Sequence, residues 1–350
     1  MKLLKNNFRI GGNVLGRKEA FLYQTLGDNM VKCRLCAHRC RIKPGATGIC
    51  RVRENKEGAL YTLVYGKAIA RNVDPMEKKP LFHFLPGTLS YSLATVGCNF
   101  RCRFCQNWEI SQGVKDNIPG ETILPEKIVE EAIFYKCQSI SYTYTEPTVF
   151  FEYAYETAEI AREKGLRNVF VTNGYQTPET VAMMKGVIDA ANIDLKSFSD
   201  DFYSRVCQAH LEPVLETIRN MHNAGITIEV TTLVVPGEND SPDELKGIAE
   251  FLVSISADIP WHLSAFSPCH QMQDARSTPA EVIHRAIEVG KKTGLNYVYS
   301  GNLPQNSCED SVCPYCGKTI IARSWFGVRK IDLKEKSYCY CGKKLPFELS

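Results

Sequence analysis

Cysteine constrains this chain more than any other residue type, because 15 of its 350 residues are cysteines and most of them are clustered. Twelve stand in three tight groups, near the N-terminus, in the middle and near the C-terminus. Residues 1–12 are basic but lack the apolar run of a secretory signal, so we expect a cytoplasmic protein with reduced thiols. Grouped reduced thiols bind metal more often than they form disulfides, and the sequence therefore predicts metal centres.

The composition is that of a folded globular chain, and it argues against several classes of partner. Hydrophobic residues make up 44% and charged residues 23% of the sequence, and the formal net charge is only +3. This charge is too small to predict binding to nucleic acid or to an anionic membrane. No uncharged apolar stretch reaches the length of about 18 residues that a membrane span needs, so no span is expected.

Strands and helices alternate along residues 90–301, which is the pattern of a parallel sheet with right-handed crossovers. The expected strands cover 90–96, 139–144, 168–173, 190–196, 226–234, 261–266 and 295–301. The expected helices cover 123–137, 148–165, 178–186, 199–206, 211–224, 241–255 and 277–294. About seven strands favour an α/β fold with an open or partial TIM-like (β/α) barrel over a complete eight-fold barrel.

Three domains are expected from this pattern. Residues 1–88 form a cysteine-rich metal-binding module with lead-in strands at 59–66 and 67–73, and residues 89–303 form the barrel. Residues 304–350 form a small module that resembles a zinc ribbon. In the first helix of the barrel, Pro125 lies in the first turn, and the apolar stripe is expected at Ile128, Val129, Ala132 and Ile133.

The central cysteines, Cys98, Cys102 and Cys105, form a C-x3-C-x2-C group directly after the first strand of the barrel. Three thiolates on a short loop can hold three irons of a [4Fe-4S] cube, which leaves the fourth iron open to a small-molecule chelate. Loops at the carboxyl ends of parallel strands face the active site in such folds. The alternatives are an incomplete zinc site or a structural cluster that takes a fourth cysteine from elsewhere.

The C-x3-C-x2-C group with Phe104 before its last cysteine resembles the signature of the radical S-adenosylmethionine (SAM) enzymes. The resemblance covers most of residues 90–301. It implies a [4Fe-4S] cluster on the three cysteines that cleaves SAM reductively to methionine and a 5′-deoxyadenosyl radical. That radical would abstract hydrogen from a substrate that the resemblance does not identify. The protein would supply orientation and exclude water and oxygen.

The same resemblance implies further SAM-binding residues. Glu146 matches an acidic residue that contacts the SAM amino group, although Tyr144 and Thr145 replace the two glycines of the family motif. The alternative for Glu146 is a carboxylate at the start of the next helix, where the helix dipole favours it. Asn173 and Asp194 resemble residues that line the cavity for SAM and substrate.

Three more residues carry alternatives of this kind. Lys196 is a candidate partner for the SAM carboxylate, or an ordinary exposed lysine. Val235 lies in a segment that resembles the ribose-side loop. His262 resembles a histidine beside SAM or the substrate, and its alternative is a core histidine with its hydrogen bonds satisfied.

Four cysteines in eighteen residues, with His38 as a fifth candidate ligand, predict a second metal centre near the N-terminus. Either a tetrahedral zinc site or an iron–sulfur cluster fits such a group. The compact C-x2-C-x3-C spacing favours iron–sulfur over zinc. The four cysteines are Cys33, Cys36, Cys40 and Cys50.

The C-terminal cysteines flank an expected hairpin at residues 319–333 and predict a zinc site. The second pair is C-x-C, with Tyr338 where C-x2-C would place a cysteine, so Cys339 is a candidate for displacement and Cys308 for its substitute. The expected ligands are Cys313, Cys316, Cys339 and Cys341. The three single cysteines are expected to be apolar core residues, with a role at the cavity as the alternative for the last: Cys137, Cys207 and Cys269.

The order of all these motifs resembles one branch, the AmmeMemoRadiSam system radical SAM enzymes, which are related to the pyruvate formate-lyase activating enzymes. This resemblance implies SAM, an external one-electron donor of the flavodoxin or ferredoxin type, and Memo-like and AMMECR-like proteins as partners. One alternative is an activating enzyme that acts on a glycine of a partner protein. Another is a non-catalytic iron–sulfur electron carrier or a zinc-stabilised interaction protein, which would not turn SAM over.

Overall fold

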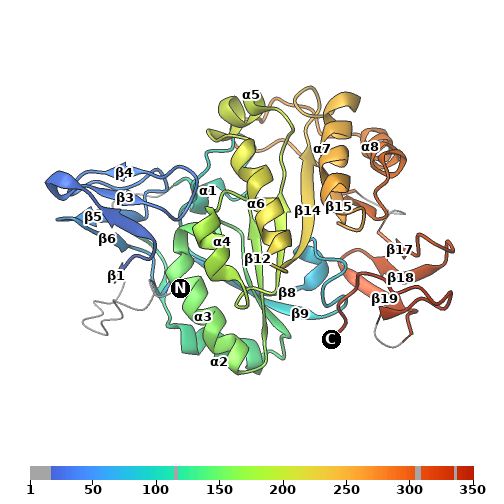
Figure 1. Cartoon of the computed structure of the whole chain (residues 1–350), viewed down its shortest axis with the longest axis horizontal. Coiled ribbons are helices and arrows are strands. Elements are labelled where there is room, and N and C mark those ends of the chain that lie inside the picture. Colours follow the sequence, from blue (N-terminus) through green and yellow to red (C-terminus); the bar gives the residue numbers. More distant parts are fainter. Residues whose placement is uncertain (1–16, 114–116, 304–308, 335–336) are drawn as a thin grey trace.

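A computed structural model describes residues 17–113, 117–303, 309–334 and 337–350, and its centre is an eight-stranded sheet (Figure 1). Neighbouring strands from β16 to β9 are parallel, and β8 pairs with β9 antiparallel at one edge. In spatial order the strands are β16 (Val298–Gly301), β15 (Trp261–Ala265), β14 (Thr227–Val234), β13 (Ala190–Asp194), β12 (Arg167–Thr172), β11 (Ser139–Tyr142), β9 (Leu89–Ala94) and β8 (Ala70–Pro75).

The seven parallel strands are those that the sequence predicts, and the α/β class with a mostly parallel sheet is confirmed. Strands β11 and β13 are buried at nearly every residue, as expected where both faces of a parallel sheet are covered. The prediction did not include β8 in this sheet, because an antiparallel edge strand joined by a loop has no crossover helix to mark it. In the observed order, β16 and β8 are the two edges.

Helices cover one face of this sheet, where α3, α4, α6 and α7 lie side by side (Figure 1). Four of the helices have a proline at one of their first two positions, where its fixed φ suits a first turn. The main helices are α2 (Pro125–Phe134), α3 (Phe151–Glu163), α4 (Pro178–Met184), α6 (Glu212–Asn223), α7 (Pro242–Ile255) and α8 (Ala280–Thr293).

Two details of the predicted helices are wrong. Ile133 is 47% exposed, whereas Pro125, Ile128, Val129 and Ala132 form the buried stripe of α2. Positions 125, 128, 129 and 132 follow the i, i+3, i+4, i+7 spacing of one helix face, and position 133 lies at the margin of that face. The helix expected at 199–206 is instead a short α5 (Asp200–Phe202) followed by a π-helical turn, η4 (Tyr203–Cys207).

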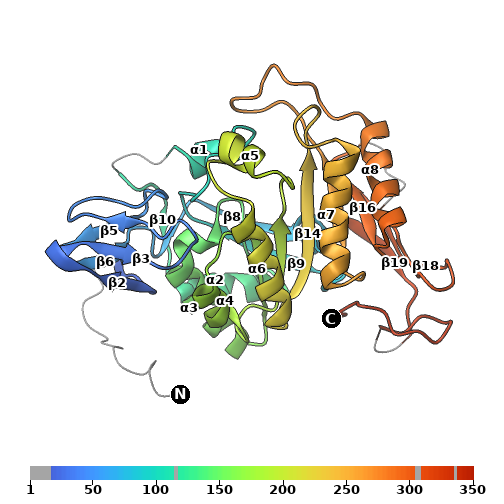
Figure 2. The ribbon, with the colours of Figure 1, turned by 45° about the horizontal axis from the view of Figure 1, so that its top comes forward.

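The N-terminal part of the chain forms two small antiparallel sheets beside the central sheet (Figure 2). Their strands are β1 (Lys18–Glu19), β6 (Ala59–Thr62) and β5 (Arg53–Lys56) in one sheet, and β2 (Tyr23–Thr25), β3 (Val31–Cys33) and β4 (Arg41–Ile42) in the other. The strand expected at 67–73 is divided into β7 (Lys67–Ala68), which pairs with β10 (Glu121–Thr122), and β8.

Two arginines of this N-terminal part bind one carboxylate of α4. Glu179, in the first turn of α4, accepts from Arg34 Nη2 at 2.6 Å and from Arg39 Nη2 at 3.0 Å. The hydrogen bond from Arg39, with a further contribution from Arg34, lowers the pKa of Glu179 to about 2. These contacts join the N-terminal part to the helical layer.

Acid is expected to weaken this connection. The folded-state pKa of Glu179 lies below its unfolded value, so its contribution is complete above about pH 4.5 and is lost as the pH falls toward 2. Glu179→Gln should lower the free energy of unfolding by about 1–2 kcal/mol at pH 7 and by much less at pH 2.5. Urea unfolding at both pH values measures this difference, and an equal loss at both would contradict it.

The C-terminal part forms a third small sheet on the opposite side of the central sheet from the N-terminal part (Figure 1). Its strands are β17 (Ser311–Val312), β18 (Thr319–Ser324) and β19 (Gly327–Ile331), and β18–β19 is the hairpin that the sequence predicts. Its buried cluster includes Ile320 and Ile321 together with Tyr299 of β16 and Phe82, which follows β8. The small sheet therefore packs against chain segments from both edges of the central sheet.

The buried Arg323 of β18 strengthens this contact by donating to the Phe82 backbone oxygen at 2.6 Å.

The helices of the described residues include none with the length and apolar character of a membrane span.

Candidate active site

A cavity of about 900 Å³ lies at the carboxyl ends of the parallel strands and brings together nine of the ten residues predicted to act in the active site. The loop after β9 contributes the cysteines, and the segments after β11, β12 and β13 contribute residues from the opposite walls. The predicted residues that line the cavity are Cys98, Cys102, Phe104, Cys105, Glu146, Asn173, Asp194, Lys196 and His262. The tenth, Val235, is fully buried and lies outside the lining.

Backbone hydrogen bonds hold the cysteine loop in place. The Arg101 N–H donates to the Cys207 carbonyl at 2.9 Å, and the Arg103 N–H donates to the Val206 carbonyl at 3.0 Å. Both acceptors belong to the π-helical turn η4, a type of turn that often occurs at functional sites. The irregular turn after β13 therefore fixes the position of the three thiols.

The three thiols differ in their contacts and in their exposure, since Cys102 is buried and Cys98 and Cys105 are partly exposed. Cys98 Sγ accepts from the Phe100 N–H at 3.3 Å, and Cys105 Sγ lies 3.3 Å from Ser111 Oγ. Burial raises the pKa of the Cys98 thiol, and the nearby Glu146 charge raises it further. A bound metal cation would reverse this preference, because it stabilises the thiolate form.

Glu146 is a buried acceptor at the join between β11 and the next helical segment. Its carboxylate accepts from the Thr148 N–H at 3.0 Å and so caps the 3-10 turn η3 (Pro147–Phe150). It also accepts from Thr172 Oγ1 at 2.8 Å and from the Asn173 N–H at 2.8 Å. Burial raises its pKa, while these hydrogen bonds oppose the rise. Glu146 thus lines the cavity and also begins a helical segment, the alternative that the sequence allowed.

Lys196 is not an ordinary exposed lysine, since its side chain is only 12% exposed. Its Nζ atom donates to Asp194 Oδ2 at 2.8 Å and lies 5.7 Å from the centre of the Phe104 ring. Burial lowers the pKa of Lys196, but the Asp194 and Cys102 charges more than offset this, and the pKa stays well above its usual value. The cavity therefore has a fixed positive charge beside the cysteine loop.

His262 belongs to a buried polar cluster behind the cavity wall. Its Nε2 atom lies 2.6 Å from Glu229 Oε2, and its ring stacks on Tyr299. Glu229 also accepts from the Phe82 and His83 N–H groups. His262 therefore both lines the cavity and has a satisfied core contact.

Several buried atoms of lining residues, one of them Glu77 Oε2, have no hydrogen-bond partner within the described residues. Two others are Asn173 Oδ1 and Thr231 Oγ1. Buried polar atoms are rarely left unpaired, so these two fit a cavity that holds a polar ligand. Three thiols, a lysine and unpaired polar atoms around one cavity match what a cluster with bound SAM requires.

Sequence reasoning missed several residues of this region. Trp325 and Phe326, at the turn of the β18–β19 hairpin, line the cavity although they lie more than 200 residues from the cysteine loop. Cys207 is buried, as predicted, but its thiol also interacts with Cys102 and raises the pKa of that thiol. Cys137 is buried, and Cys269 donates to the Cys105 carbonyl at 3.5 Å. No local pattern signals these contacts, because tertiary folding creates them.

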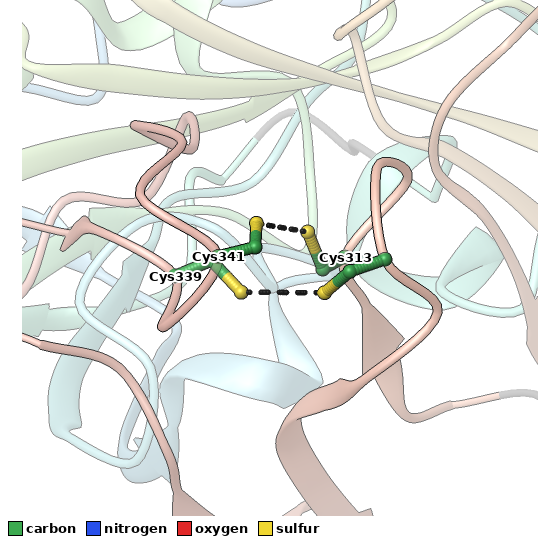
Figure 3. Close-up of side chains that lie close together, drawn as sticks. Cys313, Cys339 and Cys341 are labelled. Carbon is green, nitrogen blue, oxygen red and sulfur yellow. Dashed lines mark hydrogen bonds between the residues drawn. The ribbon is translucent and has the colours of Figure 1, made fainter.

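The four predicted C-terminal cysteines come together between two facing turns (Figure 3). All four Sγ atoms lie within 4.8 Å of one another, with 3.8 Å between Cys313 and Cys341 and 3.6 Å between Cys316 and Cys339. Cys339 therefore lies in the group with the three other expected ligands, and the C-x-C turn does not displace it. Cys308 lies outside the described residues.

Comparison with known proteins agrees with this geometry. The sequence model of the radical SAM superfamily matches residues 92–252, which hold the cysteine loop and most of the cavity segments. Residues 92–252 of this chain therefore form a domain of the radical SAM superfamily. An uncharacterized protein of Methanocaldococcus jannaschii is 46% identical over 335 residues, which cover 95% of this chain and 100% of that protein.

Two further similarities concern activating enzymes. A second protein of Methanocaldococcus jannaschii, assigned by name to the glycyl-radical enzyme activating enzymes, is 25% identical over 57% of this chain and 76% of its own length. The crystal structure of a domain of pyruvate-formate lyase-activating enzyme from Bacteroides vulgatus covers 47% of this chain and 99% of its own, with a TM-score of 0.42 and 22% identity.

Proposed function

We propose that this protein is a radical SAM enzyme whose [4Fe-4S] cluster binds to Cys98, Cys102 and Cys105. The single observation that carries this proposal is the position of the three thiols of one C-x3-C-x2-C loop on the wall of a cavity of about 900 Å³. When bound, the cluster supplies one electron for the reductive cleavage of SAM to methionine and a 5′-deoxyadenosyl radical.

The residues around the cavity would bind and orient SAM. Lys196, held by Asp194, offers a positive charge to the SAM carboxylate. Glu146 accepts a hydrogen bond from the Asn173 N–H. This bond fixes the segment after β12, in which the Asn173 side chain faces Cys98. Asn173 Oδ1 and Thr231 Oγ1 are free to accept from the ligand. His262 lines the cavity and is a candidate for a contact to SAM or to the substrate.

The substrate of the radical is a second question, and the leading alternative is a glycine of a partner protein. The relative that is named as a glycyl-radical enzyme activating enzyme supports this alternative. The exposed Trp325 and Phe326 at the cavity would suit an apolar or peptide substrate. A partner protein deuterated at glycine should transfer label into 5′-deoxyadenosine, and transfer from a small molecule alone would exclude this alternative.

One experiment tests the radical SAM proposal. The protein is purified without oxygen, reconstituted with iron and sulfide, and supplied with SAM and dithionite. We expect 5′-deoxyadenosine and methionine in equal amounts. Bound iron without 5′-deoxyadenosine would instead favour a non-catalytic electron carrier.

The membership of the AmmeMemoRadiSam branch is part of this proposal. It rests on the order of motifs along the chain, and it implies Memo-like and AMMECR-like partners and a flavodoxin or ferredoxin as electron donor. A cytoplasmic location and a division into residues 1–88, 89–303 and 304–350 complete the proposal. Co-purification of the three proteins from one cell extract would support the partners.

We also propose that the C-terminal cysteines bind one Zn²⁺ ion. Four sulfurs at about 2.3 Å from a tetrahedral zinc ion lie about 3.8 Å apart. The measured separations of 3.8 Å and 3.6 Å are close to that value. An iron–sulfur cube has four metals between its ligands and would hold the sulfurs further apart.

Loss of one of these thiols should release the zinc. Cys341→Ser is expected to lower the zinc content by one ion per chain and to destabilise the small C-terminal sheet, because structural zinc contributes directly to folding. Metal analysis and thermal unfolding measure both effects, with Cys137→Ser as the control. Unchanged zinc in Cys341→Ser would rule out this assignment.

A further inference from the structure

The four N-terminal cysteines surround a small cavity of their own. Cys33, Cys36, Cys40 and Cys50 line a space of about 20 Å³ between the N-terminal sheets and the central domain. The same cavity is lined by Arg53 of β5, by Asn99 of the catalytic cysteine loop, and by Thr148 and Val149 of η3. The group therefore lies between two parts of the fold and does not face solvent alone.

The arrangement of these thiols differs from that of the C-terminal group. Among the described residues, only the C-terminal cysteines form a set of at least three ligand atoms that all lie within 4.8 Å of one another. No three of the N-terminal thiols meet this limit, and the three catalytic thiols do not meet it either. A cluster of several metals holds its thiolates further apart than one tetrahedral ion does.

Two buried hydrogen-bond donors at this cavity lack acceptors. Arg53 is 2% exposed and Asn99 is 1% exposed, and neither Arg53 Nε nor Asn99 Nδ2 has a partner within the described residues. Donors of this kind are rarely left unpaired in a protein interior. An occupant with negative charge and several sulfur acceptors would satisfy both, and a thiolate-bound iron–sulfur cluster has these properties.

Asn99 connects this cavity to the catalytic loop. Its Oδ1 atom accepts from Asn173 Nδ2 at 2.8 Å, and the same Nδ2 atom lies 3.8 Å from Cys98 Sγ. Its backbone oxygen lies 2.8 Å from His38 Nε2. Asn99 is also the residue next to Cys98 in the chain. Asn99 therefore lies at the N-terminal cysteine cavity and also contacts the residues around the catalytic cysteine loop.

We propose that Cys33, Cys36, Cys40 and Cys50 bind a second iron–sulfur cluster, which passes single electrons across Asn99 to the cluster at the catalytic loop. The transfer part of this inference rests on the proposed radical SAM function. One electron moves for each SAM cleaved, so the N-terminal cluster is oxidised by one electron and the catalytic cluster is reduced by one. A low-potential donor of the ferredoxin or flavodoxin class then returns the electron, and no bond or proton changes in this step.

The first test counts iron in the absence of the catalytic thiols. The variant with Cys98, Cys102 and Cys105 all replaced by alanine is reconstituted without oxygen. We expect it to retain iron and sulfide and to give an electron paramagnetic resonance signal after reduction. Removing Cys36 and Cys40 as well should abolish that signal. If this triple variant bound zinc but no iron, the proposal of a second iron–sulfur cluster would be wrong. This readout requires no SAM cleavage, so it stands even if the proposed function fails.

The second test concerns electron transfer. When both clusters are reduced, the wild-type spectrum should show broadening from magnetic interaction, and Cys36→Ala should remove it. Cys36→Ala should also slow SAM cleavage by at least about tenfold with a ferredoxin or flavodoxin as donor, while cleavage with dithionite changes by less than about twofold. If Cys36→Ala slowed SAM cleavage equally with the protein donor and with dithionite, electron transfer between the clusters would be excluded. Signals from two reduced clusters that show no magnetic interaction would also exclude it.

Discussion

Replacing Cys98, Cys102 or Cys105 with alanine is expected to lower 5′-deoxyadenosine formation by at least about a thousandfold, to the background rate. Each thiol would bind one iron of the cluster, and no other cysteine among the described residues lines the cavity to replace it. Cys207 interacts with Cys102, but it is fully buried in η4. We therefore expect each variant to lose SAM cleavage completely and not to retain a slower reaction.

The control for these variants is Cys137→Ala. Cys137 is buried like Cys102 but lies before β11 and does not line the cavity. We expect this variant to keep SAM cleavage within about threefold of wild type. Each variant is assayed for iron content, for 5′-deoxyadenosine by chromatography, and for folding by circular dichroism. A folded Cys98→Ala variant with wild-type activity would remove the basis of the proposed function.

The parallel strands and the catalytic loop could be predicted because their signals are local. Apolar runs of four to eight residues between helices mark the strands, and a C-x3-C-x2-C loop after the first of them marks the site. The resemblance to the radical SAM enzymes implies that Glu146, Asn173 and Asp194 line the cavity, and they do. The carboxyl ends of parallel strands meet at one edge of a sheet, which brings these residues to the cysteine loop.

The remaining features depend on tertiary contacts that no local pattern contains. The hairpin residue Trp325 reaches the cavity because the C-terminal sheet packs against Tyr299 of β16 and against Phe82, in the segment after β8. Val235 directly follows β14, as the sequence predicts. Its N–H donates to Asn239 Oδ1 at 2.6 Å and its side chain is buried, so it does not line the cavity.

Glu152→Gln is expected to lower the free energy of unfolding by about 3–5 kcal/mol, because it breaks a buried ion pair. Glu152 of α3 is fully buried and accepts from Arg53 Nη1 and Nη2, each at 2.8 Å, and from the Phe21 N–H at 2.6 Å. Burial alone would lower the pKa of Arg53, but the Glu152 charge overcomes this and holds the pKa above its ordinary value. Glutamine would leave a buried arginine cation without a counter-charge.

Two further variants separate the structural role of this pair from its role at the N-terminal cysteines. Glu250→Gln removes an exposed partner of Lys246 in α7 and should change stability by less than about 0.5 kcal/mol in urea unfolding. The double change Arg53→Met and Glu152→Leu should recover most of the stability lost in Glu152→Gln, because an apolar pair of similar size carries no desolvation cost. It also removes the buried Arg53 donor, so it should bind less iron at the N-terminal cysteines than wild type does. Recovery of stability together with full iron binding would mean that Arg53 serves the fold alone.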